Sequence, residues 1–444
     1  MANFFKASPK KSPVQKQITV TVNRLDQQGC GVASVGKKPL FIEGVLPGEV
    51  AQVNIYQQNN KYAKGKLVKL QKSSAEREEV KCRHYYQCGG CNLQHLQYPQ
   101  QITFKQNKVE QLFARQNLAE NLPWQQAIIS NAWHYRRKAR IGVQYNKRGE
   151  PVIGFRQRES NNLTAIKSCP VLTQEFTEVF IELRNILPKL SGKNAIGHVE
   201  VIAANENALV VRQLTKMSTA DRRLWQKFSD KNHWLIFIDD GKQQLQLLND
   251  ELLLESHLLS YSLSDSVRIE FSSRDFIQVN HDVNQQMIAQ ALSWLNLKQD
   301  DVVLDLFCGL GNFSLPIAQK VKSVVGVEGV QTMVARATAN AEQNALDNCQ
   351  FFQADLNSGW SEQSWAQKRY SKVLLDPARA GAYEALTQLV KLNINTLLYV
   401  SCDPSSLACD AKLLIEYGYK IEKIAIMDMF SQTKHVETMV MFTL

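Results

Sequence analysis

The chain has 444 residues, which is more than one hydrophobic core usually serves, so the length favours two or three domains over one. Lys and Arg outnumber Asp and Glu by 52 to 42, an excess that favours a polyanionic partner such as a nucleic acid. No apolar run approaches the roughly 18 residues of a membrane helix, and residues 1–16 lack the apolar stretch of a secretory signal, so we expect a cytoplasmic protein without a membrane partner.

The chain contains nine cysteines, an odd number spread unevenly along the sequence. In a large chain without an export signal, this usage argues for thiols, metal ligands or catalytic residues and against a disulfide framework. Four of the nine have no neighbours that indicate any chemistry, and we assign them none: Cys30, Cys308, Cys349 and Cys409.

The N-terminal part of the chain predicts a small β-barrel. Residues 1–15 are basic and rich in turn formers, which indicates a flexible basic N-terminus. Residues 16–72 alternate short β-type runs with turns, which is typical of a five-stranded barrel of the OB type. The glycine-shaped turns in residues 28–33 and 41–49 resemble those of the TRAM domain, a small RNA-binding barrel attached to RNA-modifying enzymes. We therefore expect phosphate contacts from its lysines, the alternative being a barrel that only supports the rest of the chain: Lys37, Lys38, Lys61, Lys64, Lys66 and Lys69.

A cysteine cluster opens the next part of the chain. Cys82, Cys88 and Cys91 form a tight loop of three thiols, and Cys169, which precedes a proline, is the candidate for a fourth ligand. Four thiolates fit either a [4Fe-4S] cluster or a structural zinc ion, and His84 or His95 could complete a zinc site instead, so the spacing leaves both open.

The central region, residues 73–275, mixes strands and helices, and we expect an α+β domain there. It carries the basic run 133–140. We predict that four residues of this run contact an RNA backbone, the alternative being a solvated basic strand: Arg136, Arg137, Lys138 and Arg140.

From residue 300 to the end, strands and helices alternate, which predicts an α/β domain with a parallel doubly wound sheet and ligands at the carboxyl ends of its strands. The first of these strands runs into residues 308–314, where two glycines let a ligand approach the backbone. Ser314 stands where a dinucleotide fingerprint has its third glycine, which weakens a nicotinamide interpretation. Glu328 ends the next strand, where it can bind ribose hydroxyls, and Asp355 ends the one after, where it can reach an adenine. This arrangement resembles the S-adenosylmethionine site of the class I (Rossmann-like) methyltransferases.

Cys402 follows a strand of the same sheet and can face a bound base at the same edge. Carbon 5 of uracil is a poor nucleophile, and a thiolate that adds to carbon 6 activates it. A base must then remove the carbon 5 proton, and Glu437 is the candidate. Asp376 and Arg379 lie in a further strand-end turn, where they can hold the base, the cofactor or a phosphate.

Five motifs in this order resemble the RNA uracil-5 methyltransferase family, across residues 276–444: 276–280, 305–313, 376–381, 401–404 and 435–437. The resemblance implies that Cys402 is the nucleophile and Glu437 the base. It also implies a cofactor pocket lined by Gln278, Phe307, Asn312, Glu328 and Asp376, and a stacking role for Phe276.

The TRAM-like barrel and the four cysteines are similar to the branch of that family that methylates uracil 1939 of 23S rRNA. This resemblance implies 23S rRNA as the partner and a [4Fe-4S] cluster on Cys82, Cys88, Cys91 and Cys169; no protein partner can be inferred. The chain departs from the family at Asp403, often asparagine, and at Ser431, often proline. The charge of Asp403 is expected to raise the pKa of the Cys402 thiol unless a cation compensates. Two alternatives stay open, an RNA cytosine-5 methyltransferase and a noncatalytic rRNA-binding or assembly protein.

Overall fold

The computed structural model describes residues 16–118, 120–242, 245–248, 257–264 and 266–444, and the predicted flexible N-terminus, residues 1–15, lies outside them. The described chain divides into two compact units. The first contains the described residues up to Tyr86, Gly90–Gln101 and Gln432–Lys434, and the second contains Gln87–Gly89, Ile102–Ser431 and His435–Leu444. No described helix is both long and apolar enough to cross a membrane.

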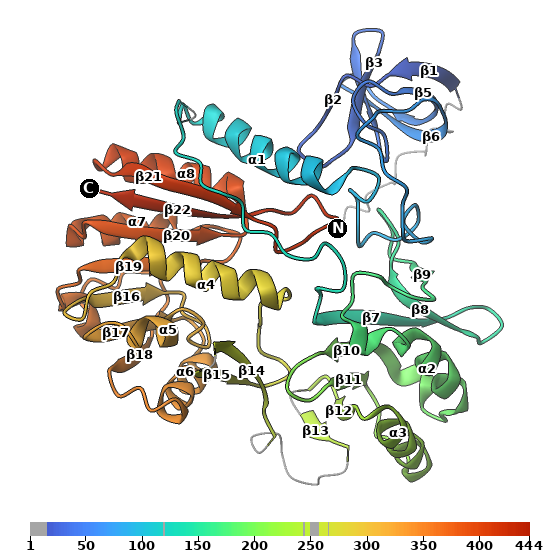
Figure 1. The fold of residues 1–444 in the computed structure, drawn as a ribbon. Helices are drawn as coiled ribbons and strands as arrows, with labels where there is room; N and C mark the ends of the chain where they lie inside the picture. The colour runs from blue at the N-terminus through green and yellow to red at the C-terminus, as the bar shows by residue number, and fades with distance from the viewer. Residues whose placement is uncertain (1–15, 119, 243–244, 249–256, 265) are drawn as a thin grey trace, which may run out of the picture. The chain divides into compact units, whose positions relative to one another are not determined.

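The first unit contains the predicted barrel (Figure 1). Its strands are β1 (Lys16–Thr21), β2 (Arg24–Leu25), β3 (Gly31–Val35), β4 (Lys38–Ile42), β5 (Val50–Gln58) and β6 (Ala63–Lys72). The sheet order is β1-β5-β6-β4-β3-β2, so the two short strands that follow each other in sequence lie at its opposite ends. The five predicted strands are all present, and the short β2 is an additional strand that the sequence did not predict.

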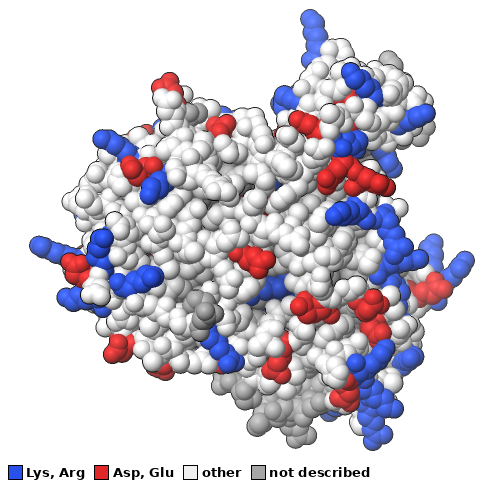
Figure 2. Space-filling view, viewed as in Figure 1, with Lys and Arg blue, Asp and Glu red and all other residues white. Residues whose placement is uncertain are grey.

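The interior of the barrel is apolar, because alternate residues of its strands point inward. Leu40, Ile42, Val53 and Ile55 are buried there. Four of the six predicted phosphate-binding lysines are exposed on the outside, and Figure 2 shows Lys and Arg side chains projecting from this unit: Lys37, Lys61, Lys66 and Lys69.

The second unit begins with most of helix α1 (Tyr98–Arg115) and a seven-stranded mixed sheet of order β13-β12-β11-β10-β7-β8-β9. These strands are β7 (Lys138–Tyr145), β8 (Pro151–Arg156), β9 (Leu163–Ala165), β10 (Ile196–Ile202), β11 (Ala208–Gln213), β12 (Leu235–Asp239) and β13 (Leu245–Leu247). Helices α2 (Val179–Ile186) and α3 (Thr219–Asn232) pack on it through Phe180 and Trp225, among other residues. The region is α+β, as expected. It also contains the short 3₁₀ helices Gln174–Phe176, Leu187–Lys189 and Lys193–Ala195.

A second seven-stranded sheet in this unit has the order β18-β17-β16-β19-β20-β22-β21. Its strands are β16 (Val302–Leu306), β17 (Ser323–Glu328), β18 (Cys349–Gln353), β19 (Lys372–Leu375), β20 (Thr396–Ser401), β21 (Lys420–Met427) and β22 (Glu437–Thr443). The helices are α4 (His281–Leu295), α5 (Ser314–Ala318), α6 (Gln331–Gln343), α7 (Tyr383–Leu389) and α8 (Pro404–Glu416), with 3₁₀ turns at Ser364–Gln367 and Val390–Leu392. Figure 1 shows the strands of this sheet spread across the view, with its helices around them.

The prediction of an entirely parallel sheet is wrong for its last strand. β22 runs antiparallel to both of its neighbours, β20 and β21. Residues 428–436, the β21–β22 loop, are too few for the crossover that a parallel connection needs, so the chain turns back as a hairpin. The start of β22 therefore lies at the edge where the parallel strands have their carboxyl ends.

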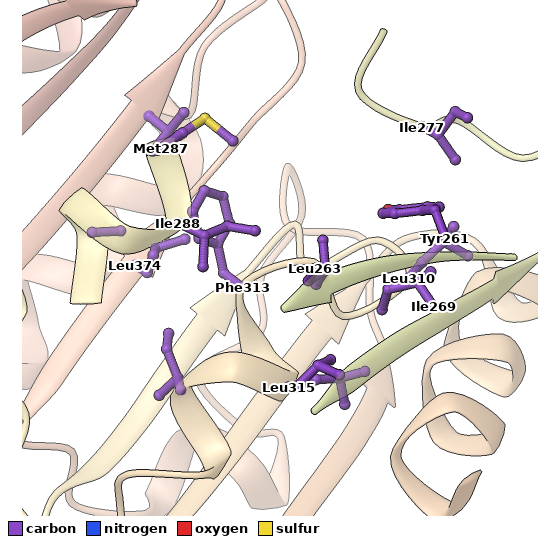
Figure 3. Packing of buried hydrophobic residues seen from close by; sticks show 14 of the residues in the cluster. Tyr261, Leu263, Ile269, Ile277, Met287, Ile288, Leu310, Phe313, Leu315 and Leu374 are labelled. Carbon is purple, nitrogen blue, oxygen red and sulfur yellow. The ribbon is translucent and has the colours of Figure 1, made fainter. Parts of the chain in front are cut away.

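The turn after β16 rests on a well-packed core. Leu310, Phe313 and Leu315 are buried in one cluster with residues of α4 and of the hairpin formed by β14 (Leu259–Ser264) and β15 (Val267–Phe271). Figure 3 shows this packing, with Leu263 and Ile269 of the hairpin near Leu310 and Leu315. The packing gives the turn a rigid base on which a ligand can be held.

Candidate active site

The chain segment after β16, residues 307–312, is called here the cofactor loop. Three of its residues have left-handed backbone angles, with φ of 63° at Phe307, 56° at Gly309 and 89° at Gly311. Such angles favour glycine, and a left-handed phenylalanine indicates a backbone held in place by its surroundings. A Cβ at Gly309 would meet only Met333 Cε, at 3.6 Å, so the space over this glycine is open for a ligand.

Glu328 ends β17 beside the cofactor loop. Its Oε2 accepts a hydrogen bond of 3.2 Å from the Gly309 N–H, and its Oε1 accepts one of 3.0 Å from the Val330 N–H. The side chain is half-buried, so the carboxylate is oriented and still accessible. Asp355 follows the next strand, β18, and is exposed. Both acids lie at the carboxyl edge of the sheet, as predicted.

Two amides close the other side of the loop. The side chains of Asn312 and Asn284 of α4 exchange two hydrogen bonds, each of 3.0 Å. Asn284 is fully buried and was not predicted as a site residue, because an asparagine inside a helical run carries no recognisable motif. Gln278 precedes α4 and is buried, with its carbonyl oxygen accepting a 2.7 Å hydrogen bond from Arg137 Nε.

Cys402 and Glu437 are brought together by strand pairing. Ser401, the last residue of β20, is the register partner of Thr438 in β22. Because the strands are antiparallel, the residue after Ser401 and the residue before Thr438 come to the same end of the pair. Cys402 is half-buried and Glu437 is buried, and among the described residues the Oε2 atom of Glu437 has no hydrogen-bond partner.

The pKa values of the site reflect burial and a dense group of acids. Burial, followed by the charges of Glu437 and Asp376, raises the pKa of the Cys402 thiol to about 11, while Arg379 acts in the opposite direction. Burial raises the pKa of Glu437 to about 8, with a further contribution from Asp376. Burial also raises the pKa of Asp376 and of Asp305 to about 7. A site with so many crowded carboxyl groups is suited to a ligand that carries a positive charge, such as a sulfonium.

Comparisons with known proteins identify the family of this chain. The sequence profile described as tRNA (Uracil-5-)-methyltransferase matches residues 97–444, and that of the TRAM domain matches residues 11–68. The chain belongs to the uracil-5 methyltransferase family. It is therefore a methyltransferase, and its C-terminal part has the class I methyltransferase fold.

Individual relatives cover the whole chain. A protein of Colwellia psychrerythraea (strain 34H) named 23S rRNA (uracil(1939)-C(5))-methyltransferase RlmD is 51% identical, with 100% of this chain and 99% of the relative covered. A protein of Aliivibrio fischeri (strain ES114) with the same name is 43% identical over 100% of both chains. The crystal structure of Pyrococcus abyssi tRNA (uracil-54, C5)-methyltransferase in complex with S-adenosyl-L-homocysteine shares the fold, with a TM-score of 0.74, 21% identity and coverage of 96% of this chain and 99% of that one.

The departure from the uracil-5 methyltransferase family at Asp403 has a structural role. Asp403 is the N-cap of α8, and its Oδ1 accepts hydrogen bonds from the backbone N–H groups of Ser405, at 2.9 Å, and Ser406, at 3.2 Å. An asparagine side chain presents the same capping oxygen. The charges that most affect the pKa of the Cys402 thiol are those of Glu437, Asp376 and Arg379, and Asp403 is not among them.

The basic run 133–140 also needs a correction. Arg137 is buried, with its guanidinium 4.0 Å from the centre of the Tyr261 ring, and Lys138 Nζ donates to the carbonyl oxygens of Ser273 and Asp275. These two cations hold the chain before α4, so they are not available to phosphates. Arg140 is 65% exposed and remains a candidate for contact with RNA.

The predicted metal ligands are not assembled into a site in this structure. Two of them, Cys82 and Cys91, belong to the first unit, and Cys88 and Cys169 belong to the second. Among the described residues, no group of three or more His, Cys, Asp or Glu side chains is placed to hold a metal ion. The structure thus does not support the [4Fe-4S] prediction.

Proposed function

We propose that this methyltransferase transfers a methyl group from S-adenosylmethionine to carbon 5 of a uracil in 23S rRNA, uracil 1939. The substrate is inferred from the relatives named for that reaction, two of which match over the full chain. The single observation that carries the chemistry is the register of β20 and β22, which brings a thiol and a carboxyl group to one edge of the sheet.

In the proposed mechanism, the Cys402 thiol, which is protonated at rest because its pKa is about 11, loses its proton to solvent as its sulfur forms a bond to carbon 6 of the uracil. The electrons of the carbon 5–carbon 6 double bond then make carbon 5 nucleophilic. S-adenosylmethionine supplies the methyl group to carbon 5 when bound. Glu437 then takes the carbon 5 proton, the double bond re-forms, and the carbon–sulfur bond to Cys402 breaks, so the thiolate is regenerated. The raised pKa of Glu437, about 8, suits a group that must gain this proton near neutral pH.

Different residues of the cofactor site are proposed to bind different parts of S-adenosylmethionine. Glu328 would hold the ribose and Asp355 the adenine, and the acids near the thiol would favour the positive charge of the sulfonium. The complete set is Gln278, Phe307, Asn312, Glu328, Asp355 and Asp376. Their fit is supported by the open space over Gly309 and by the raised pKa values of the buried carboxyl groups.

RNA binding is assigned to the parts outside the transfer site. In this proposal the barrel of residues 16–72 and the central region of residues 73–275 hold the RNA, and residues 276–444 carry out the transfer. Phe276 is 67% exposed, which suits an aromatic ring that stacks on an unpaired base. The uracil must leave its helix to reach the thiol, as in other enzymes that modify bases.

The four cysteines Cys82, Cys88, Cys91 and Cys169 are proposed to hold a structural [4Fe-4S] cluster, on the basis of their sequence pattern. Iron and sulfide analysis of anaerobically purified protein tests the proposal, and protein that binds zinc in their place would contradict it.

The proposed reaction is tested with 23S rRNA that contains 5-fluorouridine. Fluorine cannot leave as a proton does, so the reaction should stop at an adduct that resists denaturation and joins Cys402 to one methylated uridine. Mass spectrometry maps both ends, and Cys402→Ala is the control that should form none. Methylation that persists in Cys402→Ala would overturn the mechanism, a 5-methylcytidine product would indicate a cytosine enzyme, and no product with bound cofactor would indicate a noncatalytic protein.

A further inference from the structure

The β21–β22 loop, residues 428–436, ends immediately before the proposed base, Glu437, and begins with a buried ion pair. Lys105 of α1 is completely buried, and its ammonium group donates hydrogen bonds to Asp428 Oδ1 and, at 3.0 Å, to the carbonyl oxygen of Phe430. Asp428 is also buried. A lysine from a distant helix therefore holds two residues of this loop through one nitrogen atom.

Further hydrogen bonds extend from this pair along the loop. The second carboxylate oxygen of Asp428 accepts a 2.6 Å hydrogen bond from Ser431 Oγ, and the Ser431 carbonyl oxygen accepts one of 2.9 Å from the Tyr135 hydroxyl. The backbone N–H of Asp428 donates to the carbonyl oxygen of Ile128, at 2.9 Å. The Ser431 hydroxyl thus links the loop to the ion pair.

The next part of the loop, Gln432–Lys434, belongs to the first unit and makes its own hydrogen bonds there. The Gln432 N–H donates to Gln101 Oε1 at 3.1 Å, and the Gln432 carbonyl oxygen accepts from the N–H groups of Asn92 and Leu93. Gln432 has a φ of 66°, an angle that non-glycine residues adopt mainly when their contacts require it. The loop is thus fixed over most of its length before it reaches Glu437.

A buried ion pair contributes little net stability, because the free energy of removing two charges from water offsets most of their attraction. The pair also constrains geometry, since both partners must stay within hydrogen-bond distance. Asp428 follows Met427, and Met427 is the register partner of Glu437 across β21 and β22. A displacement of Asp428 would therefore be transmitted to the carboxyl group of Glu437, the proposed base.

We propose that Lys105, through Asp428, is a positioning residue for the proton-abstracting step at Glu437. This inference rests on the function proposed above. It predicts that loss of Lys105 slows removal of the carbon 5 proton by Glu437 more than it slows the addition of Cys402 to the uracil.

The test compares purified wild-type protein with Lys105→Met, which keeps the length of the side chain and removes its charge. A misplaced base should lower kcat on the order of tenfold to a hundredfold, while the Kd for S-adenosylmethionine changes by less than about twofold. A covalent adduct between Cys402 and a methylated uracil should accumulate on ordinary 23S rRNA, without fluorine. General loss of structure would not produce this adduct.

Two further variants keep the result interpretable. Lys372→Met removes a partly buried ion pair with Asp301, 3.4 Å long, at the opposite edge of the same sheet, and it should not lead to adduct accumulation. Lys105→Met/Asp428→Leu removes both charges, so it should fold even if the single variant does not. It should still accumulate the adduct.

Turnover at the wild-type rate without an adduct in the double variant would overturn the inference, as would equal losses of turnover and cofactor affinity in Lys105→Met. Failure of the proposed function is a separate result, because then the wild-type protein itself would form no adduct with 5-fluorouridine RNA.

Discussion

Ser401 and Thr438 are register partners in two antiparallel strands, and this pairing sets Cys402 and Glu437 beside each other. The arrangement depends on the reversed direction of β22, since in a parallel strand Glu437 would start at the far edge of the sheet. The pKa of the Cys402 thiol reflects this proximity. After burial, the charge of Glu437 makes the largest contribution to raising that pKa.

The replacement Glu437→Gln should make the cofactor-free protein more stable at higher pH. The folded protein holds the Glu437 proton up to a pKa of about 8, compared with an ordinary value of 4.5. Wild-type stability that comes from the neutral carboxyl group is therefore complete below about pH 4 and is lost as the pH rises towards 8. The variant lacks this loss, so its free energy of unfolding should exceed that of the wild type by at least about 1 kcal/mol near pH 8.

Urea unfolding at several values between about pH 5 and about pH 8 measures this difference. Glu362→Gln changes an exposed residue and serves as the control, with a difference from the wild type that should stay constant. A constant difference for Glu437→Gln as well would show that Glu437 has no raised pKa.

Glu328→Gln should weaken the binding of S-adenosylmethionine. The carboxylate accepts hydrogen bonds from Gly309 and Val330 and is placed to accept two more from ribose hydroxyls, whereas an amide offers only one acceptor oxygen. Loss of one charge-assisted hydrogen bond corresponds to about a tenfold to a hundredfold rise in Kd. Isothermal titration calorimetry measures it, and Glu342→Gln, which changes an exposed residue of α6, should bind as the wild type does.

The two replacements Asp403→Asn and Asp403→Ala should separate capping from charge. Asparagine retains the oxygen that caps α8, so stability should change by no more than about 0.5 kcal/mol. Alanine removes it, and the free energy of unfolding should fall by about 1 kcal/mol. If Asp403→Asn lowered the pKa of Cys402, as measured by the pH dependence of thiol alkylation, the assignment of Asp403 to helix capping alone would be wrong.

Arg140→Ala and Arg137→Ala should have different effects. Arg140 is exposed, so its loss should weaken RNA binding without reducing the stability of the protein. The slope of log K against log salt concentration should fall by the amount that corresponds to about one phosphate contact. Arg137 is buried on Tyr261 and bonded to Gln278, so its loss should reduce stability by more than about 2 kcal/mol. Filter binding over a salt series and thermal unfolding measure the two effects, and a salt effect for Arg137 alone would contradict the assignment.

The sequence predicted those features that depend on local patterns. The alternation of strands and helices after residue 300 predicted the sheet nearly to its boundaries, since hydrophobic runs of that length between turn formers have few other stable arrangements. The cofactor loop was recognisable because two glycines directly after a strand meet a requirement of the backbone itself. Cys402 was predicted as a site residue because it follows a buried strand of the same sheet.

Only the tertiary structure decided how residues distant in sequence meet. Arg137 is basic in sequence but buried in the fold, because burial depends on the aromatic ring of Tyr261 and the carbonyl of Gln278, more than 120 residues away along the chain. Lys105 gave no indication of its role either, since its partner Asp428 lies on a loop whose path depends on β22 turning back. Local propensity fixes which segments become strands, whereas strand order, strand direction and the pairing of buried charges depend on contacts between segments, which no local pattern contains.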